Sequence, residues 1–108
     1  MAAYRFVTLL DDLSADLDGE FVPLPELGLG RQNRFGAIVV IGDLGGGEVT
    51  IQGSHQPTVY AVTLRTPNDN QLVFTLADYQ PAQLLLPNIR ARLVGSSGAS
   101  GVSAFLVF

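Results

Sequence analysis

The sequence predicts an all-β fold, namely an antiparallel two-sheet sandwich of jelly-roll type with about eight strands, and a small closed barrel is the alternative. Apolar residues recur with a period of two, turn residues bound these runs about every ten positions, and helical periodicity is hard to find. A chain of 108 residues can bury a core without cross-links, so one domain over residues 1–108 is expected.

Each expected strand is an alternating or β-branched run that ends at glycine, proline or polar turn residues. The strands span residues 3–10, 19–27, 34–42, 48–53, 58–66, 71–77, 82–86, 88–95 and 101–108. The acidic segment 11–17 is expected as part of a loop with at most one helical turn. Pro23 and Pro25 bar the second segment from a central ladder position, so it should lie at an edge or cover one.

The third and fourth strands are expected to form much of the core. Residues 34–42 are apolar on both faces, which predicts a strand buried on both sides. The next strand alternates, so that Val49 and Ile51 point inward while its polar residues point outward.

Turn chemistry organises the segment that follows. The tetrapeptide PNDN (67–70) favours a turn, because proline fixes φ and Asn and Asp bond their own backbone. After it, alternation places Leu72, Phe74 and Leu76 on one face of a strand. The tetrapeptide DYQP (78–81) is expected as another connection.

The last two segments should form a hairpin around SSGAS (96–100). The final segment, GVSAFLVF, is apolar on both faces, which predicts that it lies inside a sheet and thereby anchors the chain end. One of its faces, with Phe105, is then available to a neighbouring subunit. The strand before it alternates, with Ile89, Ala91 and Leu93 on one face and Asn88, Arg90 and Arg92 on the other.

The charge content of the chain narrows its possible partners. Ten acids and six bases make 15% of the residues, the net charge is −4, and the mean hydropathy is +0.32. Such a surface has wide neutral tracts, which a monomer rarely leaves uncovered. All six bases are arginine, which is typical of interfaces, although a GC-rich genome has the same effect. The acidic balance argues against nucleic acid, and the longest apolar run, 35–42, is too short to span a membrane as a helix.

No motif for catalysis or for a cofactor is complete. Ser14, Asp16, Asp18 and Gly19 match the start of a calcium loop, but proline stands where the bidentate glutamate is needed. The glycine-rich loop 42–48 lacks the Lys-Ser/Thr end of a phosphate loop. The sequence therefore predicts no cofactor and no metal.

A hydrolytic or metal-dependent enzyme is not expected either. The chain has no cysteine and a single histidine, His55, which is expected on a surface loop. We therefore expect the protein not to be an enzyme. A carbohydrate-binding or other small-ligand-binding β-sandwich is an alternative to a structural role, with Tyr79 as the tyrosine best placed for a ligand.

The segment PNIRARLVGSSGASGVSAFLVF (87–108) resembles the closing hairpin of small β-sandwich structural proteins in tailed-bacteriophage virions. In these proteins a Pro-x-apolar-Arg-Ala-x-apolar strand leads through a turn of small residues to a Gly-Val-x-apolar-x-apolar strand. Many of them are capsid decoration, or cement, proteins. The resemblance covers about the last twenty residues.

The resemblance implies a virion protein on the outer capsid surface, made in the host cytoplasm, that reinforces the shell by bridging subunits. Its partners would be the major capsid protein or other virion proteins, and further copies of itself as a trimer or a dimer. A neck, tail or fibre-base role is the alternative within this class. The candidate contact residues are Tyr4, Arg5, Phe6, Arg90, Arg92 and Phe105; a solvated sheet face is the alternative for Arg90 and Arg92, which share one face of a strand.

Overall fold

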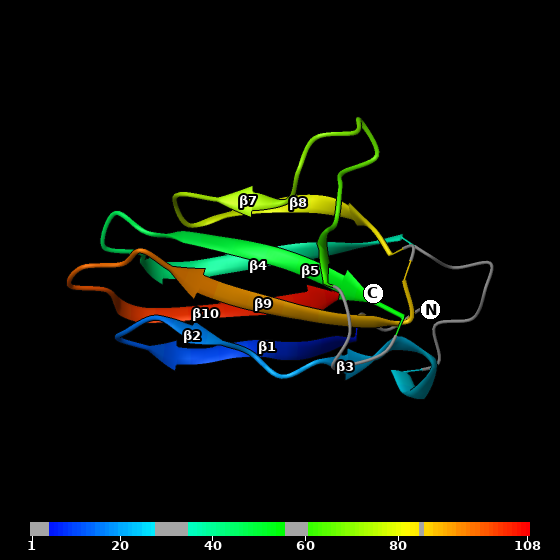
Figure 1. Ribbon diagram of the computed structural model, residues 1–108, viewed down its shortest axis with the longest axis horizontal. Coiled ribbons are helices and arrows are strands. Elements are labelled where there is room, and N and C mark those ends of the chain that lie inside the picture. The colour runs from blue at the N-terminus through cyan, green and yellow to red at the C-terminus, as the bar shows by residue number, and fades with distance from the viewer. Residues whose placement is uncertain (1–4, 28–34, 56–60, 85) are drawn as a thin grey trace.

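The chain folds into two antiparallel sheets (Figure 1). The computed structural model describes residues 5–27, 35–55, 61–84 and 86–108. Sheet A has the spatial order β1 (Phe6–Leu13), β10 (Ser100–Val107), β4 (Phe35–Asp43) and β8 (Asp78–Gln83). Sheet B has the order β2 (Leu17–Asp18), β9 (Asn88–Val94), β5 (Glu48–Ser54) and β6 (Val62–Thr63). β3 (Val22–Pro23) also pairs with β9, β7 (Val73–Phe74) also pairs with β5, and one 3₁₀ turn, η1, spans Leu24–Leu27.

The strand order is that of a jelly roll. Chain neighbours β1 and β2, β4 and β5, and β8 and β9 lie in opposite sheets, so the chain passes repeatedly from one layer to the other. Strands that are far apart in the sequence therefore become neighbours within each sheet, as in a double Greek key. The two sheets remain separate, which confirms the sandwich and not the closed barrel.

The core lies between the two sheets and consists of the inward residues of the long strands. Val49 and Ile51 are fully buried, as the alternation of β5 predicts. The inward face of β9 is also buried, with Ile89, Ala91 and Leu93 at 0–1% exposure. These side chains meet inward residues of sheet A, which are Leu9, Leu10, Ile38, Val40, Ala82, Val102, Ala104 and Leu106.

The C-terminal strand lies inside sheet A, which confirms the expectation from its two apolar faces. β10 pairs with β1 on one side and with β4 on the other. Beyond the strand, Phe108 exchanges two backbone hydrogen bonds with Arg5, of 2.8 and 2.9 Å. The chain end is thus held by ladder bonds to two neighbours.

Several local expectations are wrong. The strand expected over residues 19–27 is reduced to β3 followed by the 3₁₀ turn η1, and Leu76, expected on one strand face with Leu72 and Phe74, lies beyond β7 and is 75% exposed. The acids Asp11 and Asp12 continue β1 instead of forming a loop or helical turn, because β1 is an edge strand whose exposed side tolerates charge. Residues 78–81 belong to strand β8 and not to a turn, because an edge strand also accepts a proline. Strands expected over 58–66 and 71–77 shrink to β6 and β7; of these positions, residues 58–60 lie outside the described part of the chain.

Candidate interaction surface on sheet A

The outward side of sheet A is built from alternate residues of four strands. We call it the outer face of sheet A, and it consists of Phe6, Thr8, Ala37, Val39, Ile41, Tyr79, Pro81, Phe105 and Val107. The strand registers align most of these residues in rows across the sheet. One row is Thr8, Phe105, Val39 and Tyr79, and the next is Phe6, Val107, Ala37 and Pro81.

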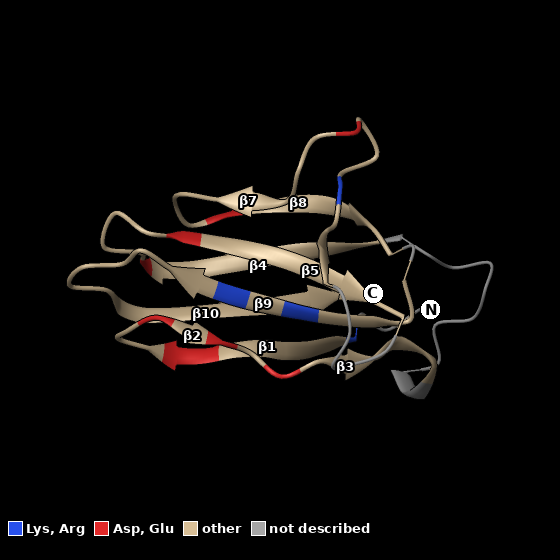
Figure 2. Ribbon diagram, in the orientation of Figure 1, with Lys and Arg blue, Asp and Glu red and all other residues tan. Residues whose placement is uncertain are grey.

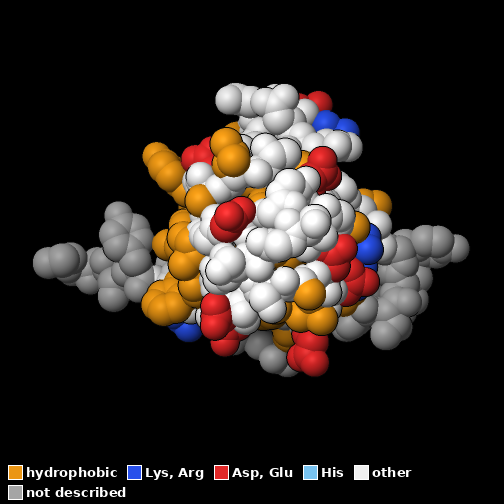
Figure 3. Space-filling model, turned by 90° about the vertical axis from the view of Figure 1, so that its left-hand side faces the viewer, with side chains coloured by type: hydrophobic (Ala, Val, Ile, Leu, Met, Phe, Trp, Pro, Cys, Tyr) orange, Lys and Arg blue, Asp and Glu red, His pale blue; other side chains and the backbone are white. Residues whose placement is uncertain are grey.

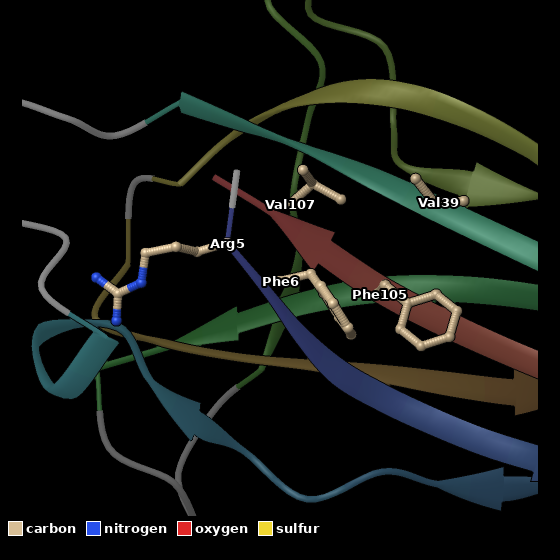
Figure 4. A pocket seen from close by; sticks show the side chains of 5 residues that line it. All are labelled: Arg5, Phe6, Val39, Phe105 and Val107. Carbon is tan, nitrogen blue, oxygen red and sulfur yellow. The ribbon is translucent and has the colours of Figure 1, made fainter. Parts of the chain in front are cut away.

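The middle of the outer face is a shallow apolar hollow (Figure 4). Arg5 lines one edge of it, and Phe6, Val39, Phe105 and Val107 line the rest; the rings of Phe6 and Phe105 meet edge to face with their centroids 5.8 Å apart. These side chains come from β1, β4 and β10, which are brought together only by the sheet topology. The hollow is therefore a product of the fold and not of one segment.

Large apolar side chains on this face are open to solvent. Phe6 is 68% exposed, Tyr79 69% and Ile41 47%. The expectation that residues 34–42 are buried on both sides is thus wrong for the single chain: Ile38 and Val40 are buried, but the other side of β4 is uncovered. Seen from the end of the sandwich, hydrophobic side chains gather along the left edge of Figure 3, the side on which sheet A lies. Exposed contiguous patches of this kind mark interaction sites.

The nine residues of the outer face of sheet A include no charged side chain, and the same alternation reaches the exposed acids Asp11 of β1 and Asp43 of β4 only at one end of the sheet. By contrast, the outer face of sheet B is polar, and its arginines have partners within the chain. Arg90 donates from Nε to Oε1 of Gln52 at 2.9 Å, and its guanidinium lies 4.6 Å from the ring centre of Phe21. Arg92 pairs through Nε with Oδ1 of Asp18 at 2.6 Å. Sheet B therefore has the character of a solvated face.

The candidate contact residues from the sequence fall on different parts of the molecule. Phe6 and Phe105 lie together on the outer face of sheet A, whereas Arg90 and Arg92 lie on the opposite side of the sandwich. Their role in a contact with another protein stays a prediction, and Tyr4 lies outside the described residues. Arg5 stands at the edge of the hollow with its side chain directed away from Phe6 (Figure 4), and its guanidinium lies 5.2 Å from the ring centre of Phe108.

Sequence reasoning missed the contributions of β4 and β8 to this face. Val39 and Ile41 were expected to be buried, and Tyr79 was expected in a turn. The sequence signal for the contribution of β4 was the presence of apolar residues on both sides of the strand expected over residues 34–42. It could not reveal that one side faces outward beside Phe105, because about sixty residues separate β4 from β10 in the chain.

The acidic segment that resembles a calcium loop has a structural role at Asp16. Its Oδ2 accepts the backbone N–H of Gly95, and its Oδ1 accepts both the backbone N–H and the hydroxyl of Ser96. The carboxylate thus ties the chain before β2 to the turn between β9 and β10. Within the described part of the chain, no three His, Cys, Asp or Glu side chains are grouped to hold a metal ion.

Asp16 should make the stability of this turn depend on pH. The hydrogen bond from the Ser96 side chain, followed by those from backbone N–H groups, lowers the pKa of Asp16 below its ordinary value of 3.8. A carboxyl group whose pKa is depressed in the folded state stabilises the fold at pH values above its unfolded-state pKa. This stabilisation is lost as the pH falls through its folded-state pKa. We expect Asp16→Asn to lower Tm by a few degrees at pH 7.

Melting curves at pH 7 and pH 3 would check this prediction, because the Tm difference between wild type and Asp16→Asn should narrow at pH 3. Ser96→Ala removes the largest cause of the pKa shift and should reproduce part of the effect. A difference in Tm that is the same at both pH values would contradict the proposed charge-dependent bonds.

Other sequence candidates do not form sites. His55 is exposed after β5, as expected for a loop histidine. The glycine-rich loop contributes Gly42, Asp43 and Gly46 to a hollow that also includes Leu76, and the described lining contains no basic side chain for a phosphate. No helix in the described ranges is long and apolar enough to cross a membrane.

The fold has a known counterpart among solved structures. It is similar to the crystal structure of the SPBc2 prophage-derived protein YomS, with a TM-score of 0.67 and 12% sequence identity. The similarity covers 98% of this chain and 94% of the YomS chain. At this level of identity the likeness shows a shared fold. No protein-family model matches the sequence, and no curated protein sequence matches it.

Proposed function

We propose that this protein is a non-enzymatic structural component of a tailed-phage virion, acting as a capsid decoration protein that stabilises the shell by bridging subunits. The observation that carries the proposal is the uncharged outer face of sheet A, with Phe6, Ile41 and Tyr79 each about half exposed or more. A face of this kind gains free energy when another protein covers it. Such a role needs no cofactor and no reaction chemistry.

Two further points support the phage assignment within this proposal. The C-terminal hairpin resembles that of phage virion proteins, and the fold is similar to that of a prophage-derived protein. The jelly roll also occurs in viral capsid domains, as it does in lectin domains and cupins. A neck, tail or fibre-base position would use the same face, with a different lattice as the partner.

Attachment to assembled shells tests the proposed function. Purified protein would be mixed with capsids of the phage that encodes it, prepared without it, and the bound fraction measured by sedimentation. We expect saturable binding to assembled shells and none to isolated shell subunits. Phe105→Glu should reduce occupancy at least about tenfold, because it places a charge in the middle of an apolar contact.

Arg90→Ala combined with Arg92→Ala is the matched variant on the opposite sheet. The sequence reading predicts that this double variant weakens attachment more than stability, whereas the intrachain partners of both arginines favour unchanged occupancy. Loss of occupancy only in the arginine variant would move the lattice contact to sheet B. Full occupancy in both variants, or no binding by the wild type, would overturn the proposal.

A carbohydrate-binding module is a second candidate, favoured by three aromatic side chains on the outer face of sheet A. Tyr79 lies in the same row as Phe105, and Phe6 lies in the adjoining row. Aromatic faces suit sugar rings, but the described positions of this face offer only the hydroxyl groups of Thr8 and Tyr79 to hydrogen-bond a sugar. A rise in Tm with an oligosaccharide, absent in Tyr79→Ala, would favour this candidate.

A further inference from the structure

We propose that the open edge of strand β1 accepts an extended segment of the shell subunit as a further strand of sheet A, with apolar residues facing inward and lysine or arginine among the others. This inference rests on the proposed function for the identity of the partner. It leaves the outer face of sheet A to the lattice contact, because the added strand lies beside that face. It is carried by the backbone groups at the edge of β1, by a groove along this edge and by the charge around the groove.

The first half of β1 leaves backbone groups unpaired at the lower border of sheet A in Figure 1. Arg5 and Phe108 exchange two backbone hydrogen bonds, so antiparallel alternation makes the pair at Val7 the next bonded one. Phe6 and Thr8 therefore direct their N–H and C=O groups away from β10. None of the described residues bonds to these groups, because β1 pairs only with β10. An added antiparallel strand can form four backbone hydrogen bonds with them.

The opposite border of sheet A, at β8, offers no free N–H group among the described residues. Alternation directs the backbone groups of Tyr79, Pro81 and Gln83 outward there. The Tyr79 N–H donates to Oδ1 of Asp78 at 2.8 Å, proline has no N–H, and the Gln83 N–H donates to the carbonyl oxygen of Arg65 at 2.9 Å. In β1 both register shifts, which protect an edge, lie in the second half of the strand. The first half of β1 is thus the border that is open to strand addition.

A groove runs along the same edge and would receive side chains of the added strand. It lies between β1 and the segment from β2 to β3, and its volume is about 480 Å³. Its apolar lining includes Leu13, Leu17, Phe21 and Val22, of which Leu17 is 51% exposed. Side chains on the inner side of an added strand would continue the row of Val7, which packs against the core, and would cover this lining. The inner positions of the strand are therefore apolar.

The charge around the groove is acidic. Asp11, Asp18 and Glu20 are exposed and line it, and no basic residue is present in its described lining. Asp18 pairs with Arg92, whereas Asp11 and Glu20 have no ion-pair partner among the described residues. Figure 2 shows acidic residues in red on β1 and along the segment from β2 to β3. Lysine or arginine in the added strand would meet these carboxylates, so a basic strand is favoured over an acidic one.

A peptide titration tests the strand site on the full chain in the absence of shells. The probe is a synthetic peptide of about nine residues in which valine and lysine alternate, and the amide resonances of the isotopically labelled protein are followed. We expect saturable shifts and slower hydrogen exchange at the amides of Phe6 and Thr8, but not at Tyr79 on the opposite edge. The same peptide with glutamate in place of lysine should bind at least about tenfold more weakly at low salt. No saturable change at Phe6 and Thr8, or equal binding of the two peptides, would overturn the inference.

Thr8→Pro and Thr8→Val are a matched pair of variants for this site. Proline removes the outward N–H of Thr8 and blocks strand addition, but it removes no bond to β10, because that N–H faces the open edge. Valine keeps the N–H and a side chain of similar shape. Thr8→Pro should weaken binding of the valine–lysine peptide at least about tenfold, whereas Thr8→Val should leave it unchanged. Equal binding by the two variants would overturn the inference, and if Thr8→Pro does not fold, the exchange measurement on the wild type decides.

The shell-attachment assay separates this inference from the proposed function. If Thr8→Pro attaches to shells as fully as Thr8→Val while Phe105→Glu does not, the strand contact is overturned and the virion role stands. Weaker attachment of Thr8→Pro than of Thr8→Val would support the strand contact. A wild-type protein that binds the peptide but never attaches to shells would overturn the virion role, and with it the shell subunit as the source of the strand, while the edge of β1 stands as a binding site.

Discussion

Gly42→Ala should lower the free energy of unfolding by about 3 kcal/mol or more, which is a large part of the stability of a small domain. Gly42 lies near the end of β4 with φ at +100°, a region that side chains rarely adopt. A Cβ built there would lie 2.2 Å from the carbonyl oxygen of Gly101 in β10. The backbone strain at Gly42 and the steric overlap with Gly101 both involve main-chain atoms, which cannot shift without a further loss of free energy.

The structural reason for Gly42 and Gly101 is a bulge between the two inner strands of sheet A, where β4 ends and β10 begins. The register between β10 and β4 shifts between Ser100 and Ser103, and Gly101 within that interval has φ at +62°. Such a bulge bends both strands where they approach the β9–β10 turn.

Gly46→Ala is the matched control for Gly42→Ala. Gly46 also has a positive φ, of +79°, but no atom lies within 4 Å of a Cβ placed there. This variant should lower the free energy of unfolding by only about 1 kcal/mol, because only the left-handed backbone conformation disfavours the added Cβ. Urea denaturation of both variants measures the difference. Equal losses would show that the contact with Gly101 is relieved by a small shift of the backbone.

The sequence predicts the long strands well, because their inward residues alternate over seven or more positions. β5 and β9 begin where the pattern predicts and end within one residue of it, and β10 is offset by one residue. In each of these strands an inward apolar residue such as Ile51 or Leu93 is buried, so burial and periodicity carry the same information.

The edge strands escape prediction for a physical reason. β1 contains two register shifts and the residue Asp12 at φ +52°, and β8 contains Pro81. Charge, irregularity and proline protect an exposed edge from unwanted pairing, yet the same features are typical of loops in a sequence. The outer face of sheet A can therefore be predicted only in part from the sequence. Phe6 and Phe105 could be chosen from apolar runs, but the position of Tyr79 on this face follows only from the pairing of β8 with β4.

Deletion of residues 105–108 should prevent folding. These residues include Leu106, which is fully buried, and Phe105 and Val107, which pair with both β1 and β4. Loss of a buried leucine alone costs about 2–5 kcal/mol, and removal of the segment also leaves half of β1 without its only ladder partner in the described sheet. Together these losses exceed the stability available to most domains of this size.

Circular dichroism melting and the spread of amide resonances would measure the effect of this deletion. The truncated chain should lack a cooperative transition or be recovered only as aggregate, because the deletion exposes the inward faces of β1 and β4. Deletion of Phe108 alone is the control: it leaves β10 complete through Val107 and removes two backbone bonds with Arg5. That shorter deletion should still fold and melt at a moderately lower temperature. A cooperative melting transition in the chain without residues 105–108 would show that β1 and β4 can pair directly and close sheet A. The outer face of sheet A would then lose its central strand while the core remained intact.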